Sequence, residues 1–153
     1  MSLTAALLGL VAANAATAAT ANASGAPQPF TITETIIPAA GVSAFTATGP
    51  LCPSGTFADD VSVFAPSAGN SHSNGLNLLI HTVYTCADGS GTFNMLKHVL
   101  LTFTDTGFTG TGPVQIHGGT GACAELSGQG VDTGARVGDQ GFGNITGTVL
   151  TTG

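Results

Sequence analysis

The sequence has few charged residues, and positive ones are almost absent. Only Lys97 and Arg136 are basic, against eight aspartates and glutamates, so the formal net charge of the 153-residue chain is −6. Proteins that bind nucleic acids or anionic membrane surfaces neutralise phosphates with clustered lysine and arginine. The composition therefore argues against nucleic acid as a partner and against a stable membrane association. With charged residues at 7%, solubility depends on Thr, Ser, Asn and Gly, a composition typical of secreted β proteins.

Tryptophan and the common metal-binding and catalytic motifs are also missing. There is no Trp and only one tyrosine, Tyr84, which disfavours sugar binding on stacked aromatic rings. The histidines, at positions 72, 81, 98 and 117, form no H-x-H or H-E-x-x-H pattern, and the cysteines form no C-x-x-C pair. The Gly-x-Ser-x-Gly nucleophile motif is absent too. The sequence therefore nominates no metal ion, no cofactor and no particular reaction.

The residues that are abundant predict an all-β fold. Glycine occupies 23 positions, and glycine in a helix interior costs about 1 kcal/mol, whereas the frequent Thr and Val favour strands. From Phe30 the pattern has a period of two, with Ile32 and Glu34 on the face of Phe30 and threonines on the other face. Turn-forming residues separate the further extended segments, at about residues 43–48, 56–64, 76–86, 92–104, 109–117, 128–132 and 144–151.

About eight antiparallel strands in one domain, residues 24–153, predict a closed β-barrel. A chain of this length has room for one core and one domain. The sequence Asp88-Gly89 supplies the positive φ that a tight hairpin needs between two of the strands. Closure removes the exposed edges that eight strands without a covering helix would otherwise leave. A β-sandwich is the alternative architecture.

Residues 1–23 have the features of a secretory signal peptide. They are rich in alanine, residues 3–13 are their most apolar part, and Ala21-Asn22-Ala23 forms an A-x-A cleavage site before Ser24. The apolar part is too short for a membrane span, which takes about 20 residues. No Lys or Arg precedes it, so either the true start lies upstream or the n-region is atypical. An ordered N-terminal helix of the mature fold is the alternative. We expect the mature protein to be secreted or periplasmic.

An exported location suits a disulfide, and Cys52 and Cys86 are the expected pair. Each lies at the edge of a predicted strand, and the two are 34 positions apart. A disulfide that closes a loop of this length typically contributes roughly 2–4 kcal/mol to stability. The third cysteine, Cys123, is then left as a free thiol.

Two charged residues fall on strand faces that should point into the barrel. Glu34 shares its face with Ile32, and Lys97, the only lysine, shares its face with Met95 and Val99. A buried carboxylate without a partner has its pKa raised, so an internal ion pair between Glu34 and Lys97 is the expected arrangement. The alternatives are a β-bulge that turns Lys97 to solvent and an ion pair with a purely structural role.

The Asp88-Gly89 hairpin extends this pair to a candidate ligand-binding cluster. It places His81 opposite or next to Lys97 or His98, in a register that the sequence does not fix. A carboxylate beside an imidazole or amine within an apolar barrel is the kind of environment that tunes general acids and bases. The candidate ligand-binding residues are Glu34, His81, Tyr84, Lys97 and His98.

A glycine-rich motif follows the extended residues 112–116. The segment Gly118-Gly119-Thr120-Gly121, followed by Leu126, Gly128 and Gly130, resembles the GGTGxYxxLxGxG signature of allene oxide cyclase-like and dirigent-like β-barrels. Cys123 stands where that signature carries an aromatic residue. The glycines of residues 118–121 predict a tight connection between strands, where side chains would clash.

The resemblance implies an eight-stranded barrel that holds a hydrophobic small molecule in its interior, and a barrel of this size can enclose one small ligand. In the plant cyclases a cavity glutamate and an ordered water steer a reactive epoxide. Glu34 maps onto that glutamate, while Ile36 stands where those enzymes carry a polar residue. Dirigent proteins use cavity acids, for which Asp59 and Asp60 are the nearest candidates. Because they are adjacent in a strand, at most one of them faces the interior.

The leading hypothesis is an exported barrel that binds a small hydrophobic molecule. The rival is a barrel with a filled interior that acts as a secreted structural or surface-interaction protein through its Thr/Gly-rich loops. A third hypothesis is an isomerase or cyclase that acts on an apolar substrate. An interior packed solid with side chains would favour the rival. The sequence predicts no oligomeric state.

Overall fold

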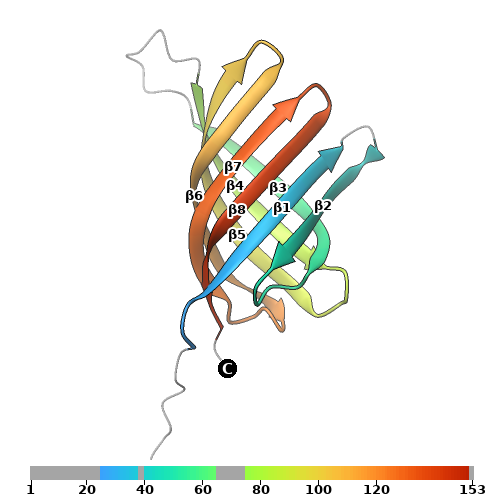
Figure 1. The fold of residues 1–153 in the computed structure, drawn as a ribbon, viewed down its shortest axis with the longest axis vertical. Coiled ribbons are helices and arrows are strands. Elements are labelled where there is room, and N and C mark those ends of the chain that lie inside the picture. The colour runs from blue at the N-terminus through green and yellow to red at the C-terminus, as the bar shows by residue number, and fades with distance from the viewer. Residues whose placement is uncertain (1–24, 38–39, 65–74, 152–153) are drawn as a thin grey trace, which may run out of the picture.

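The computed structural model describes residues 25–37, 40–64 and 75–151, which form a closed β-barrel (Figure 1). Each strand pairs antiparallel with the next one in the chain, and the last strand closes the barrel on the first. The predicted all-β barrel is confirmed, and the architecture is not a sandwich. The predicted signal peptide, residues 1–23, lies outside the described residues. The strands are β1 (Gln28–Ile37), β2 (Val42–Thr48), β3 (Ser54–Phe64), β4 (Gly75–Cys86), β5 (Gly91–Thr104), β6 (Gly107–Gly121), β7 (Ser127–Val137) and β8 (Gln140–Leu150).

Alternation along each strand decides which side chains fill the barrel. On β5, Met95, Lys97 and Val99 are buried, whereas the residues between them are more exposed. The pairing carries this parity to the neighbouring strands, because Lys97 lies opposite Ile80 on β4 and Val114 on β6. The alternation that predicted an inward-facing Lys97 is therefore present, and no bulge turns this residue to solvent.

One end of the barrel interior is filled by aromatic side chains. The ring of Tyr84 stacks on Phe93 with 4.5 Å between centroids, and Phe45 contacts Tyr84 edge-on at 5.1 Å. The expected disulfide between Cys52 and Cys86 belongs to the same buried cluster, with an S–S distance of 2.10 Å. It ties the β2–β3 connection to the end of β4, so this end of the barrel is both packed and cross-linked.

The wall formed by β7 and β8 is lined by glycine. The inward-facing positions pair Gly130 with Gly147 and Gly134 with Gly143. A Cβ atom on Gly143 would lie 2.6 Å from Oε2 of Glu34. Glycine on this wall therefore makes room for the large and charged side chains that the other strands send into the interior.

The ends of β6 and β7 differ from the sequence-based expectation. The glycines of residues 118–121, predicted to form a connection, are the last part of β6, and the turn follows at residues 122–125. Gly119 passes so close to β5 that a Cβ atom would lie 1.8 Å from the carbonyl oxygen of Thr92. Strand β7 continues to Val137, past the predicted end at residue 132, because its pairing with β6 and β8 outweighs the low strand propensity of its glycines.

The barrel wall is weakest between β2 and β3. These strands pair only over residues 44–46 and 54–56, so the rest of β3 has no β2 partner beside it. Val61 and Val63 are 48% and 59% exposed although their parity directs them inward. Within the described ranges, no strand covers the interior on this side, at the end opposite the aromatic cluster.

Candidate ligand pocket

The part of the interior beyond the aromatic end contains a pocket of about 250 Å³. It exists because the facing positions on β6, β7 and β8 are Gly110, Gly134 and Gly141, which send no side chain into it. Asp59 and Asp132 contribute two carboxylates to its lining. The apolar part of the lining includes Ile36, Val61, Leu78, Ile80, Val99 and Phe108.

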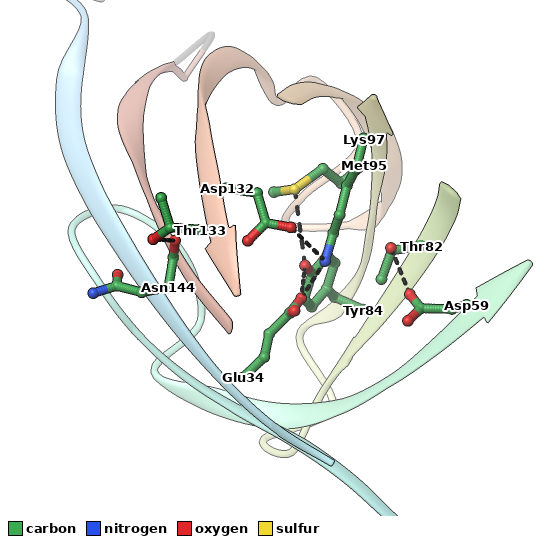
Figure 2. A network of polar contacts seen from close by, with 9 residues as sticks. All are labelled: Glu34, Asp59, Thr82, Tyr84, Met95, Lys97, Asp132, Thr133 and Asn144. Atoms are coloured by element: carbon green, nitrogen blue, oxygen red, sulfur yellow. Dashed lines mark hydrogen bonds and ion pairs between the residues drawn. The ribbon is translucent and has the colours of Figure 1, made fainter. Parts of the chain in front are cut away.

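Polar side chains point toward one another inside the barrel (Figure 2), from Tyr84 of the aromatic end to Asp132 of the pocket lining. Lys97 Nζ lies 2.5 Å from Oε1 of Glu34, so the ion pair expected from the sequence is present. The Tyr84 hydroxyl donates a hydrogen bond to the same carboxylate oxygen. Asp132 approaches Lys97 from the other side, with Oδ2 3.9 Å from Nζ. We call these four residues, from β1, β4, β5 and β7, the polar layer.

Aromatic rings surround the Lys97 ammonium. Its Nζ lies 5.7 Å from the ring centroid of Tyr84 and 5.8 Å from that of Phe57, within the range of cation–π attraction. Lys97 and Glu34 are 2% and 5% exposed. Charges so deeply buried are tolerated only when they are paired and hydrogen-bonded, which the contacts of Lys97 and Glu34 provide.

Burial shifts the pKa of two members of the polar layer. Desolvation, followed by the nearby charge of Glu34, raises the pKa of Tyr84 well above its usual value of 10.0, so its hydroxyl stays protonated and remains a donor. Desolvation also raises the pKa of Asp132 from 3.8 to about 6, although the charge of Lys97 opposes the rise. A pKa of about 6 means that Asp132 changes its charge between mildly acidic and neutral pH.

Asp132 has an oxygen without a partner. Asp132 as a whole is 8% exposed. Its Oδ1 atom is buried and has no hydrogen-bond partner within the described part of the chain. Asp59 differs, because its Oδ1 accepts a 2.6 Å hydrogen bond from Thr82 and the residue is exposed. Of the adjacent acids Asp59 and Asp60, the first lines the pocket and the second lies on the outer surface opposite His81.

The structure brings three of the five candidate site residues together. Glu34, Tyr84 and Lys97 meet in the polar layer, whereas His81 and His98 are exposed on the outer face of the barrel. The predicted cluster of five residues is therefore wrong for the two histidines. His81 pairs with Leu96, which places it next to Lys97 in the register as expected, but on the opposite face of the sheet.

The two histidines are outside because successive residues of a strand point to opposite faces. Lys97 points inward, so His98 points outward, and the buried Thr82 places its neighbour His81 outside in the same way. The His81 ring lies 5.7 Å from that of His117 on the outer surface. Across the described residues, no three His, Cys, Asp or Glu side chains are grouped so as to hold a metal ion.

Asp132 is the residue of the site that sequence reasoning missed, although a signal for it exists. It alternates with Gly128, Gly130 and Gly134 along β7, and these glycines face the interior. An acid on the glycine face of a strand is therefore an acid inside the barrel. The signal is weak because glycine carries no hydrophobic pattern by which to recognise a buried face.

A second hollow, of about 500 Å³, lies on the outer surface of β6, β7 and β8. Its lining includes Gln115, His117, Ser127 and Gln129, which are exposed polar residues. None of its lining residues is a buried charged residue or has a buried polar atom without a partner, so the interior pocket is the better candidate site.

The described ranges contain no helix that is long and apolar enough to cross a membrane. No protein-family model, no curated protein and no solved structure matches this chain. The interior pocket and the polar layer beneath it are the structural features that indicate a function.

Proposed function

We propose that this protein is an exported β-barrel that binds a small, largely apolar molecule in its interior pocket, in the manner of dirigent-like and allene oxide cyclase-like barrels. The observation that carries the proposal is the combination of apolar walls with a few converging polar groups, which is the usual composition of a ligand site. At the packing density of proteins, 250 Å³ accommodates roughly ten non-hydrogen atoms. The opening between β2 and β3 offers such a molecule a way in.

Export is supported by the disulfide and by the composition. Disulfides persist in oxidising compartments and are rare in the cytosol, and the chain contains a Cys52–Cys86 disulfide. The apolar N-terminal residues with their A-x-A site agree with this location. The resemblance to the two barrel families depends on the glycine motif at residues 118–130.

The rival, a filled structural barrel, accounts for only half of the interior. Tyr84, Phe93 and Met95 are fully buried and fill the aromatic end. Beyond the polar layer, glycines replace side chains on three strands and the space stays open. A structural protein has no need of an acid without a partner beside such a space, because an unsatisfied buried carboxylate costs stability. Binding is therefore the function that the interior favours.

Calorimetric titration with indole, a neutral apolar molecule of about the pocket's size, tests the proposal. Leu78→Trp places a bulky ring in the pocket, whereas Leu79→Trp makes the same exchange on the outer face, one residue away. We expect indole to bind the wild type and Leu79→Trp, and to bind Leu78→Trp at least tenfold more weakly while its circular dichroism remains that of a folded barrel. Equal binding to both variants, or no binding to the wild type, would overturn the proposal.

A further inference from the structure

The unpartnered oxygen of Asp132 indicates what kind of polar group the ligand carries. Oδ1 is buried and has no hydrogen-bond partner among the described residues, and Asp132 is one of the residues that line the pocket. A carboxylate oxygen accepts hydrogen bonds, so the group that satisfies it must be a donor, either N–H or O–H. A ligand carboxylate or ether has no such donor, and a carboxylate would also be repelled by Asp132.

The charges around the pocket favour a cation over a neutral donor. Among the described residues, the charged side chains that face this region are Glu34 on β1, Asp59 on β3, Lys97 on β5, and Asp132 and Arg136 on β7, while Tyr84 on β4 is neutral. Strands β2, β6 and β8 send no titratable group inward. Three acids thus face one ammonium group and one guanidinium group.

Neither of these two cations pairs closely with Asp132. Lys97 Nζ lies 2.5 Å from Oε1 of Glu34 but 3.9 Å from Oδ2 of Asp132, so Lys97 interacts more strongly with the glutamate. Arg136 donates from Nε to the carbonyl oxygen of Gly138, at the end of β7. Asp59, at the opening of the pocket, adds an acid that, unlike Asp132, has no basic partner within salt-bridge distance among the described residues. The pocket therefore has an excess of negative charge beside its apolar walls.

Building on the proposed function, we propose that the ligand is a small organic cation: an amine with an apolar body, whose ammonium group donates a hydrogen bond to Oδ1 of Asp132. The ammonium donates a hydrogen bond to the unpartnered oxygen and balances the negative charge of the carboxylate. An alcohol donates the hydrogen bond but leaves the charge unbalanced. The apolar body occupies the space between Ile36, Ile80 and Val99. The net charge of −6 on the whole molecule attracts cations towards the barrel as well.

Binding of an amine requires Asp132 to be ionised, which gives the proposal a pH signature. Burial raises the pKa of this residue to about 6, so it is mostly charged at pH 7.5 and mostly protonated at pH 5. A protonated Asp132 offers the ammonium no charge. We expect amine affinity to fall by about tenfold between pH 7.5 and pH 5, and the affinity of a neutral ligand to change much less.

The test compares three molecules that share a phenyl body: 2-phenylethylamine, 2-phenylethanol and phenylacetate. Their affinities are measured by calorimetry at 0.15 M salt, which screens long-range attraction to the net charge. Asp132→Asn removes the acceptor charge in the pocket. Asp60→Asn removes the same charge from the outer face of the barrel and serves as the matched control.

We expect the amine to bind the wild type at least tenfold more tightly than the alcohol, and Asp132→Asn to lose most of this preference while Asp60→Asn keeps it. If the alcohol or the carboxylate binds as tightly as the amine or more tightly, the proposal of an amine ligand is overturned. The proposed function then remains intact, provided that indole still binds. Amine binding that is insensitive to Asp132→Asn and to pH would overturn the proposal of an amine ligand too. Failure of indole and of all three molecules to bind would remove both proposals.

Discussion

Lys97 is the residue on which the electrostatics of the interior depend. It is the only lysine of the chain, it is 2% exposed, and it pairs with a carboxylate that also accepts the Tyr84 hydroxyl. Removing one partner of a buried ion pair leaves an uncompensated charge, whereas replacing both partners by neutral groups is often tolerated. The Glu34–Lys97 ion pair therefore adds little to the stability of the fold, but it restricts which side chains the interior tolerates at these two positions.

We predict that Lys97→Met lowers the free energy of unfolding by about 3–5 kcal/mol, because Glu34 is then a buried carboxylate without a counter-charge. Adding Glu34→Gln should restore most of the loss, since the amide keeps an acceptor for Tyr84 and carries no charge. Urea unfolding of the two variants and the wild type measures both effects. A single variant as stable as the wild type, or a double variant no better than the single one, contradicts this role for the pair.

The titration of Asp132 predicts a pH-dependent effect on stability. Its pKa is about 6 in the folded protein and near 3.8 in the unfolded chain. Between these values the folded state holds a proton that the unfolded state has released, so stability falls as the pH rises through this window. A pKa difference of this size corresponds to about 3 kcal/mol.

Asp132→Asn removes this titration. The variant should therefore be about as stable as the wild type near pH 4 and more stable by up to about 3 kcal/mol above pH 7. Urea unfolding at pH 4, 6 and 8 measures the difference, with Asp60→Asn as the control in which it stays small at every pH. A difference that does not widen with pH, or that has the opposite sign, would mean that burial does not hold the proton on Asp132.

At the scale of the strands, glycine on β8 leaves room for the polar layer. The glycine at position 143 pairs with Glu34 on β1 and lies directly against its carboxylate. A residue with a side chain there would force the carboxylate away from Lys97. The absence of a side chain on β8 is therefore part of the site, although glycine carries no chemistry itself.

We predict that Gly143→Ala destabilises the barrel by about 1–3 kcal/mol, the usual cost of overpacking a core. Its Cβ atom would lie 2.6 Å from Glu34 Oε2. Gly141→Ala is the control on the same face of the same strand, because its Cβ atom would lie 3.3 Å from the side chain of Ile36, a contact that a small shift relieves. Thermal unfolding of the two variants should rank them in this order. The reverse order would show that Glu34 is free to move.

Strand alternation explains how much of the fold and site was predictable. The period of two around Phe30 and Lys97 predicted the all-β class and the inward direction of Glu34 and Lys97, because alternation is a local property of the chain. The partner of His81 was not predictable. It depends on the register between β4 and β5, and a single step in register changes which residues face one another.

Asp132 was missed for a different physical reason. Its neighbours on the inner face of β7 are glycines, so the strand shows no apolar alternation, and its strand character comes from pairing with β6 and β8. The pocket was equally hidden, because it is space left by glycines on three different strands. Such a space is a property of the closed barrel and not of any one segment.

At the scale of the whole molecule, the barrel has two unlike halves. The half cross-linked by Cys52 and Cys86 is packed with aromatic side chains and provides stability. The half beyond the polar layer is open between β2 and β3 and provides the pocket. Stability and binding are thus separated along the barrel axis, so a change in one half should leave the other largely intact.

Replacement of both disulfide cysteines, Cys52→Ser with Cys86→Ser, should lower the free energy of unfolding by roughly 2–4 kcal/mol, because a link across 34 positions restrains the unfolded chain. Urea unfolding measures the loss, and indole titration of the still-folded variant should give the wild-type affinity. Cys123→Ala leaves the disulfide in place and should cost less. A loss of indole affinity as large as that of Leu78→Trp would contradict the separation of the two halves.

The most direct test of the account is native mass spectrometry of the protein purified from a host that exports it, beside Leu78→Trp and Leu79→Trp prepared in the same way. We expect an excess mass on the wild type and on Leu79→Trp that disappears on denaturation, and a bare polypeptide for Leu78→Trp. A bare polypeptide in all three samples, with no uptake of added indole or 2-phenylethylamine, would contradict it and leave a barrel whose pocket binds nothing.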